Sequence, residues 1–223
     1  MGSHRRWLVM SALTAVGLYA VLWVGFAHHW TWLADVDSAA LNTFHRHGEG
    51  RPGWVHGWDV FCTVLGPAAF RLVTVVLIVV AFVRRQIRIA VFLIVTVELA
   101  GLVTEIAKAA ADRPRPSTAF VTALGTSFPS GHALGVIVAV LALLAVGLPI
   151  TRPPVRAVLI AAGAIVVITI GIGRVVLNVH HPSDVVAGWA LGYAYFVLCL
   201  LLVAPSRPVT EAGEIPEAPG IAR

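Results

Sequence analysis

Three short stretches contain most of the side chains that could do chemistry, and each lies at the end of an apolar segment. They comprise Lys108 and Arg115-Pro116, then Pro129-Ser130-Gly131-His132, and then Arg174, His180 and Asp184. Ionisable groups are costly in the hydrocarbon of a bilayer and are retained there mostly for function. Their recurrence at corresponding ends of apolar segments predicts one polar site that is cationic and contains two histidines.

The third stretch indicates an activated imidazole at the start of a helix. Pro182 and Asp184 suit the first helical turn, and Asp184 follows His180 by four residues. The carboxylate can therefore reach back to one ring nitrogen, which fixes the tautomer and makes the other nitrogen more nucleophilic. His181 stands three residues before Asp184, so spacing alone leaves it open as the nucleophile. Solvated histidines before an ordinary helix are the structural alternative.

The other two stretches are typical of anion sites. Ser130 is a good N-cap, Gly131 lets the backbone approach a ligand, and His132 stands at a helix N-terminus, whose free N–H groups attract anions. Lys108 and Arg115 flank a helix end rich in proline, so both cations can turn toward one anion. Glu105 can pair with Lys108 three residues on, and Glu98 is interpreted as a packing residue. The alternatives are a merely capped helix and a lysine that extends to the lipid headgroups.

Composition determines the class of protein. Of 223 residues, 58% are hydrophobic and 12% are charged, and the mean hydropathy of +0.87 is too high for a soluble core of this size. An all-α integral membrane bundle of six transmembrane helices is predicted, because six apolar runs approach the length of about 20 residues that spans a bilayer. The predicted spans are 7–27, 60–83, 88–108, 132–150, 155–176 and 184–204. The net charge of +5 is scattered in pairs between these runs, with no basic stripe, which argues against nucleic-acid binding.

The loops predict an orientation in the plasma membrane. The turns at 84–88 and 151–156 are basic, and cytoplasmic loops collect Lys and Arg, so both termini are expected in the cytoplasm and the site on the outer face. An outer loop is predicted at 28–58, with four tryptophans suited to the membrane interface and a short amphipathic cap beside the site. Residues 1–204 are predicted to form one membrane-embedded domain, and 205–223 a disordered cytoplasmic tail.

In this order and spacing, the three stretches resemble the three-part signature of the type 2 phosphatidic acid phosphatase family, whose fold is shared with vanadium haloperoxidases. The resemblance covers about residues 60–204. It implies that His180 attacks phosphorus to form a phosphohistidine, that Asp184 orients it, and that His132 protonates the leaving oxygen and then activates water. It also implies which residues bind the phosphate: Lys108, Arg115, Ser130, Gly131 and Arg174. The family usually has serine where this chain has Gly173, so one hydroxyl contact to phosphate is missing.

The resemblance implies an enzyme that removes phosphate from a membrane lipid phosphate or pyrophosphate at the outer leaflet. No cofactor or metal is expected, because the sequence has no acidic cluster with the spacing of Mg²⁺ ligands. The first-choice substrate is an isoprenyl diphosphate of the undecaprenyl type used in cell-envelope synthesis, and phosphatidic acid or phosphatidylglycerol phosphate is the alternative. A protein that binds or transports lipid phosphate is the non-enzyme alternative, and a haloperoxidase is disfavoured by the six spans. The oligomeric state stays open.

Overall fold

The computed structural model describes residues 2–205, all of them helical or in connections, with no strand in that range. The predicted tail, from residue 206 onward, lies outside the described residues. The helices are α1 (Ser3–Ala27), α2 (Thr31–Gly48), α3 (Pro52–Val64), α4 (Pro67–Val83), α5 (Ile87–Leu93), α6 (Ala100–Ala111), α7 (Gly131–Gly147), α8 (Pro153–Val176) and α9 (Pro182–Leu202). A π-helical turn, Ile94–Glu98, joins α5 to α6, and a 3-10 turn, Leu148–Ile150, follows α7.

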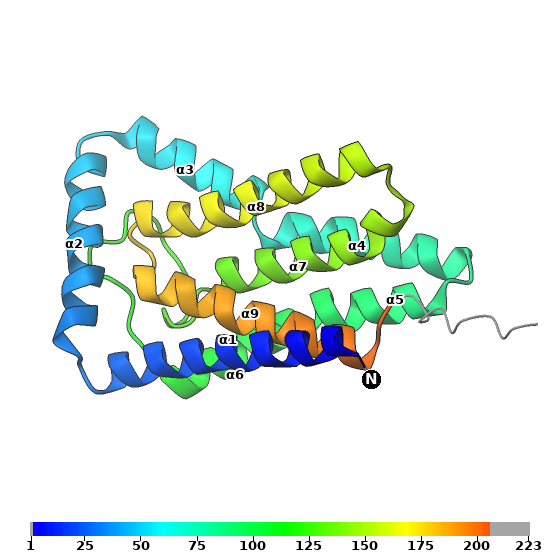
Figure 1. Cartoon of the computed structure of the whole chain (residues 1–223). Coiled ribbons are helices and arrows are strands. Elements are labelled where there is room, and N and C mark those ends of the chain that lie inside the picture. Colours follow the sequence, from blue (N-terminus) through cyan, green and yellow to red (C-terminus); the bar gives the residue numbers. More distant parts are fainter. Residues whose placement is uncertain (1, 206–223) are drawn as a thin grey trace, which may run out of the picture.

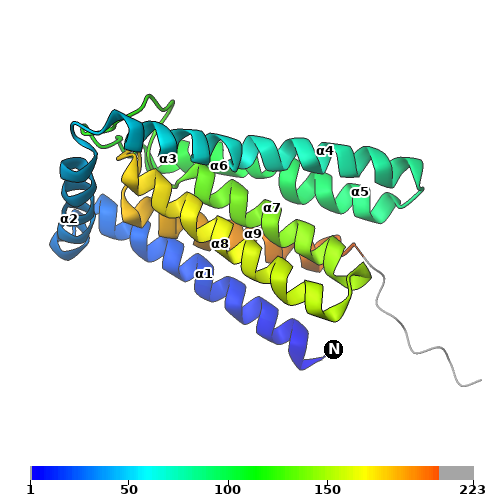
Figure 2. The same ribbon diagram turned by 90° about the horizontal axis from the view of Figure 1, so that it is seen from above.

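Among residues 2–205, six helical stretches are long and apolar enough to cross a membrane, which confirms the predicted bundle. They are α1, α3 with α4, α5 with α6, α7 with its 3-10 turn, α8 and α9, and they run side by side (Figures 1 and 2). The second span begins at Pro52 rather than at residue 60, because a proline in the first helical turn starts α3. A second proline, Pro67, begins α4 and separates the two halves of this span.

The segment predicted as an outer loop, 28–58, is mostly helical. It contains α2 and the first two turns of α3. α2 lies across one end of the bundle, almost perpendicular to the other helices (Figure 1). Leu33, Asp37 and Leu41 are buried at every fourth position, so one face of α2 packs on the bundle against α8 and α9. This periodicity makes the segment a surface helix rather than a loop, and the predicted amphipathic cap is this helix.

The N-termini of α7 and α9 are held together by close helix packing. α9 packs against α1 and α7, and α7 also contacts α4, α6 and α8. A Cβ at Gly188 of α9 would lie 2.6 Å from the carbonyl oxygen of Ser130, so glycine permits this approach. On the other side, Thr104 of α6 lies 3.1 Å from the Cβ position of Gly131. The starts of α7 and α9 and the end of α6 therefore meet at one end of the bundle.

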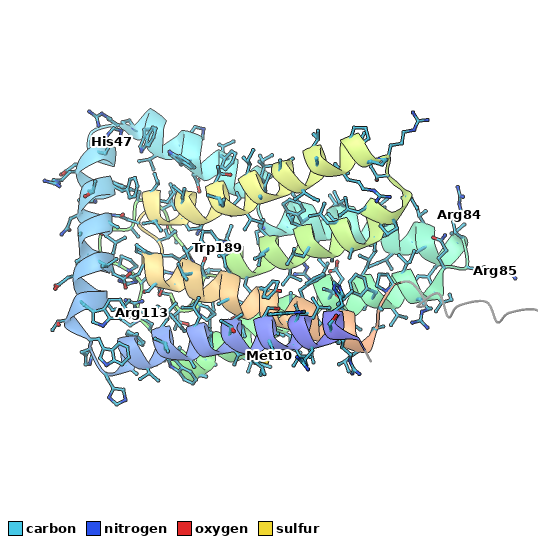
Figure 3. The ribbon with its side chains drawn as sticks, viewed as in Figure 1. Met10, His47, Arg84, Arg85, Arg113 and Trp189 are labelled. Atoms are coloured by element: carbon cyan, nitrogen blue, oxygen red, sulfur yellow. The ribbon has the colours of Figure 1, made fainter. Side chains whose placement is uncertain are left out.

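The two ends of the bundle differ in character. Arg84 and Arg85 in the α4–α5 turn lie at the end where α1 begins and α9 finishes, whereas Arg113 lies at the opposite end beneath α2 (Figure 3). The predicted gathering of the motifs at one end and of the basic turns at the other is thus observed. Which end faces the cytoplasm stays a prediction.

Candidate active site

His180 lies in the short link between α8 and α9 and is almost fully buried, with 1% of its surface exposed. Nη1 of Arg115 lies 3.2 Å from its Nε2. Because a guanidinium can only donate, Nε2 is the acceptor, and this contact assigns the ring proton to Nδ1. The lone pair of Nε2 therefore lies beside a cation that could also bind an anionic phosphate ester.

Nδ1 of His180 faces two oxygens, and the closer is not the predicted carboxylate. Oδ2 of Asp184 lies 3.6 Å away, beyond ordinary hydrogen-bond distance, and Oγ of Ser127 lies 3.5 Å away. The Ser127 hydroxyl also donates a short hydrogen bond to Oδ2 of Asp184. Asp184 and His180 are thus linked partly through Ser127, a buried residue that the sequence interpretation missed.

His181 has a different environment from His180. Its Nδ1 lies 3.1 Å from Oδ2 of Asp184, and its backbone N–H donates to the same oxygen at 2.8 Å. The backbone contact is one half of a capping box at the start of α9, and the other half joins the backbone N–H of Asp184 to the His181 side chain. His181 is therefore engaged in the cap, whereas His180 contacts Arg115, and this geometry favours His180 over His181 as the candidate nucleophile.

Burial lowers the pKa of His180 to about 4. Asp184 acts in the opposite direction, whereas the nearby Arg174 and Arg115 favour the neutral imidazole further. Since the ring is then uncharged at neutral pH, Nε2 keeps the lone pair that nucleophilic attack requires.

Three cations lie within electrostatic range of one another: Lys108, Arg115 and Arg174. Arg115 is fixed by hydrogen bonds to the carbonyl oxygens of Leu124, Gly125 and Val179, at 2.8, 3.0 and 2.8 Å. Burial and the nearby Arg174 lower the pKa of Arg115, although an arginine stays charged at any physiological pH. A fixed cation cluster of this kind is suited to the oxygens of a phosphoryl group.

Arg174 has a feature that fits an anion, and Lys108 has a carboxylate beside it. Arg174 is buried, and its Nε has no hydrogen-bond partner among residues 2–205. An orphaned buried N–H is costly, and a bound phosphate oxygen would satisfy it. Nζ of Lys108 lies 3.8 Å from the exposed carboxylate of Glu105, the pairing predicted from their spacing.

The start of α7 offers backbone donors, although not the one at Ser130. Ser130 Oγ caps the N–H of Ala133 at 3.4 Å, and its own N–H donates to the carbonyl oxygen of Asp184 at 2.9 Å. Ser130 therefore joins α7 to α9 and is already satisfied. The N–H groups of Gly131 and His132 have no acceptor within the part of the chain that the structure describes. These two remain for a ligand.

The structure brings the predicted site residues to one end of the bundle. His132 interacts electrostatically with Arg174, His180, Arg115 and Lys108. Its ring also lies beside the break between α3 and α4, where a Cβ at Gly66 would be 3.4 Å from Cδ2 of His132.

A buried ion-pair network supports Asp184, and sequence reasoning missed it. Nη1 of Arg113 donates to Oδ1 of Asp184 at 2.7 Å, and its Nη2 donates to Oδ2 of Asp37 at 2.8 Å. Asp37 also accepts hydrogen bonds from the N–H and the hydroxyl of Ser183, at 3.0 and 2.6 Å. Figure 3 shows Arg113 between α2 and the start of α9. The available signal was an aspartate on the otherwise apolar face of α2, between Leu33 and Leu41.

Gly173 marks a packing contact. A Cβ at this position would lie 2.5 Å from Sγ of Cys62 and 3.0 Å from the Trp58 ring. The serine usual in the family would therefore collide with α3. Close packing of α3 on α8 accounts for the departure from the family pattern.

The described residues hold no group of three or more His, Cys, Asp and Glu side chains placed to bind a metal ion. A reaction without a metal stays a prediction, and chelation tests it.

Comparisons with known proteins point to one family. The family model of the PAP2 superfamily matches residues 89–208. The chain is similar to phosphatidylglycerophosphatase B of Bacillus subtilis, with 31% identity over 153 residues, which are 66% of this chain and 75% of that protein. It is also similar to lipid A 1-phosphatase of Rhizobium etli, with 33% identity over 129 residues, which are 52% of this chain and 51% of that protein, so it spans about half that protein's length.

A solved structure has the same fold. It is the crystal structure of a transmembrane PAP2-type phosphatidylglycerolphosphate phosphatase from Bacillus subtilis, with a TM-score of 0.74. The likeness covers 86% of this chain and 95% of that chain at 20% identity. At this identity the likeness establishes the six-span architecture alone.

Proposed function

The chain belongs to the PAP2 superfamily, and we propose that it removes phosphate from the headgroup of a membrane lipid through a phosphohistidine on His180. The observation that carries this proposal is the environment of His180: a buried neutral imidazole whose Nε2 lone pair contacts Arg115. Because Arg115 touches Nε2 directly, a phosphate held by its guanidinium lies beside the attacking nitrogen.

The proposed reaction has two steps. In the first, Nε2 of His180 forms a bond to phosphorus while the bond from phosphorus to the lipid oxygen breaks, and His132 gives that oxygen a proton. In the second, His132 takes a proton from water, the water oxygen bonds to phosphorus and the P–N bond breaks, which releases inorganic phosphate. Lys108, Arg115 and Arg174 stabilise the charge on the phosphoryl oxygens throughout.

Within this class of substrate, a glycerolipid phosphate is favoured by the names of the relatives, which include a phosphatidylglycerophosphatase. An isoprenyl diphosphate, predicted first from the sequence, remains in the test because the same cation cluster would accept it. A substrate with its tail in the bilayer fits a site at one end of six spans. The basic turns at 84–88 and 151–156 lie at the end of the bundle away from the site, and their positive charge supports a cytoplasmic location for that end. The site would then lie on the outer face.

The test is phosphate release by the purified protein in detergent, with and without EDTA. The substrates are phosphatidylglycerol phosphate, phosphatidic acid and a prenyl diphosphate. We expect turnover that survives EDTA, is lost in His180→Ala and is retained in His47→Ala, which changes an exposed histidine on α2. Absence of turnover on every lipid, or equal turnover in His180→Ala, would contradict the proposal.

A further inference from the structure

Arg71 and Glu98 form an ion pair within the spans, away from the proposed catalytic groups. Nε of Arg71 in α4 lies 3.1 Å from Oε2 of Glu98 in the π-helical turn, and their side chains are 50% and 20% exposed. The sequence interpretation of Glu98 as a packing residue missed this partner. Charged groups at this depth are costly and are retained mostly for function.

The surface around Arg71 faces lipid. Its neighbours along α4 and α6 are exposed and apolar: Leu72, Val75, Leu102 and Ile106. Arg71 donates through Nε to Glu98, and neither Nη atom has an acceptor among residues 2–205. Oε1 of Glu98 is buried without a partner as well. The Nη groups of Arg71 are therefore free to donate to an acceptor that a lipid supplies.

The contact with α6 places the guanidinium of Arg71 about one turn deeper than the active site. Nη1 of Arg71 lies 3.8 Å from the Cβ position of Gly101 in α6. The next turn of α6 carries Thr104, which packs on Gly131 at the start of α7. One helical turn rises about 5.4 Å, so the guanidinium lies roughly that far below the backbone donors of the phosphate site.

The start of α4 places the backbone of Arg71 deeper still, about two turns below His132. Pro67, its first residue, lies 2.9 Å from the Cβ position of Gly135, one turn into α7 from His132. Arg71 follows Pro67 by four residues, in the next turn toward the bilayer centre. It thus lies below His132, at the contact between the second and third spans.

We propose that Arg71, oriented by Glu98, donates hydrogen bonds to the ester carbonyl oxygens of a glycerolipid substrate and so selects ester-linked glycerolipid phosphates. This inference rests on the proposed function. In such a lipid, the ester carbonyls lie a few bonds from the phosphate, toward the bilayer centre. Dialkyl ether lipids and prenyl phosphates have no carbonyl at that depth. A charged donor with no protein acceptor gains most from a carbonyl oxygen in hydrocarbon.

The experiment compares a diester and a diether glycerolipid phosphate that share headgroup and chain length, with a prenyl phosphate as a third substrate. For the natural chain we expect kcat/KM to be about tenfold higher with the diester than with the diether. Arg71→Met should lose this preference by slowing the diester alone. Glu98→Gln should lose part of it. Arg84→Met, the same change in an exposed turn, should leave all three substrates unaffected.

Other outcomes separate the possibilities. If Arg71→Met slows all three substrates equally, the pair is only a structural tie and the inference is wrong. It is also wrong if the natural chain does not distinguish diester from diether. Should the single variant fail to fold because Glu98 is left unpaired, the Arg71→Met/Glu98→Met double variant removes both charges and carries the same expectation. No turnover of any substrate by the natural chain would instead contradict the proposed function.

Discussion

Asp37→Asn tests whether α2 supports the carboxylate of Asp184 and, through it, the proposed activity. Asp37 is 1% exposed and accepts three hydrogen bonds, one from Arg113 and two from Ser183. Asparagine keeps the shape and one acceptor oxygen, but its NH₂ group faces the N–H and O–H donors of Arg113 and Ser183. Arg113 then keeps Asp184 as its only carboxylate partner among residues 2–205. Breaking a buried ion pair on one side costs about 3 to 5 kcal/mol. We expect a loss of stability of that size.

Activity should fall further than stability alone explains, because Arg113 also contacts Asp184. The assay is thermal unfolding in detergent, paired with kcat/KM at a temperature where the variant is folded. Asp35→Asn is the matched control, since Asp35 is an exposed aspartate on the same helix. Unchanged unfolding and unchanged kcat/KM in Asp37→Asn would refute this role for α2.

A double variant separates stability from catalysis. Arg113→Met leaves two buried carboxylates, Asp37 and Asp184, without their cation, whereas Asp37→Leu/Arg113→Met leaves only Asp184 unpaired, so the double variant should be more stable than Arg113→Met. It should not recover kcat/KM, because Asp184 still lacks its cation. Recovery of full activity would show that the network acts only on folding.

The remaining predictions concern protonation, packing and phosphate binding. Burial lowers the pKa of His180 to about 4, so kcat/KM should stay level as the pH falls from neutral. It should drop near pH 4, where the imidazole of His180 becomes protonated. A drop near pH 6.5 would contradict this prediction. Gly173→Ser should cost about 1 to 3 kcal/mol of stability through overpacking on Cys62, and Cys62→Ala should restore the thermal midpoint. Arg174→Met should raise the inhibition constants of inorganic phosphate and vanadate about tenfold or more, and unchanged constants would argue against Arg174 as a phosphate ligand.

The sequence could place the candidate site residues wherever their position depends on nearby residues in the chain. Apolar runs define the spans, and a lysine, a capping serine and a proline with an aspartate mark helix ends at Lys108, Ser130 and Pro182. Successive spans alternate in direction, so the end of α6, the start of α7, the end of α8 and the start of α9 lie at the same end of the bundle. The motifs at these helix ends could therefore be placed together. The i, i+4 spacing also brought Asp184 near His180, although at 3.6 Å.

The supporting contacts depend on tertiary structure and escaped prediction for that reason. Asp37 is linked to Asp184 through Arg113. These three residues lie far apart in the chain and meet only because α2 folds across the end of the bundle. Ser127 lies in a connection without periodicity, so nothing local indicates that it faces His180. The lengthened second span required Pro52 to be recognised as a helix start rather than as a loop residue.

The central claim is that Nε2 of His180 forms the bond to phosphorus. The most direct measurement is to quench the enzyme during turnover of a lipid carrying ³²P in its phosphate and to map the labelled residue. The account predicts an acid-labile, alkali-stable phosphohistidine at position 180, absent in His180→Ala and more abundant in His132→Ala provided attack still occurs. Label on His181, or steady turnover of the natural chain with no trapped phosphoenzyme under any quench, would contradict it.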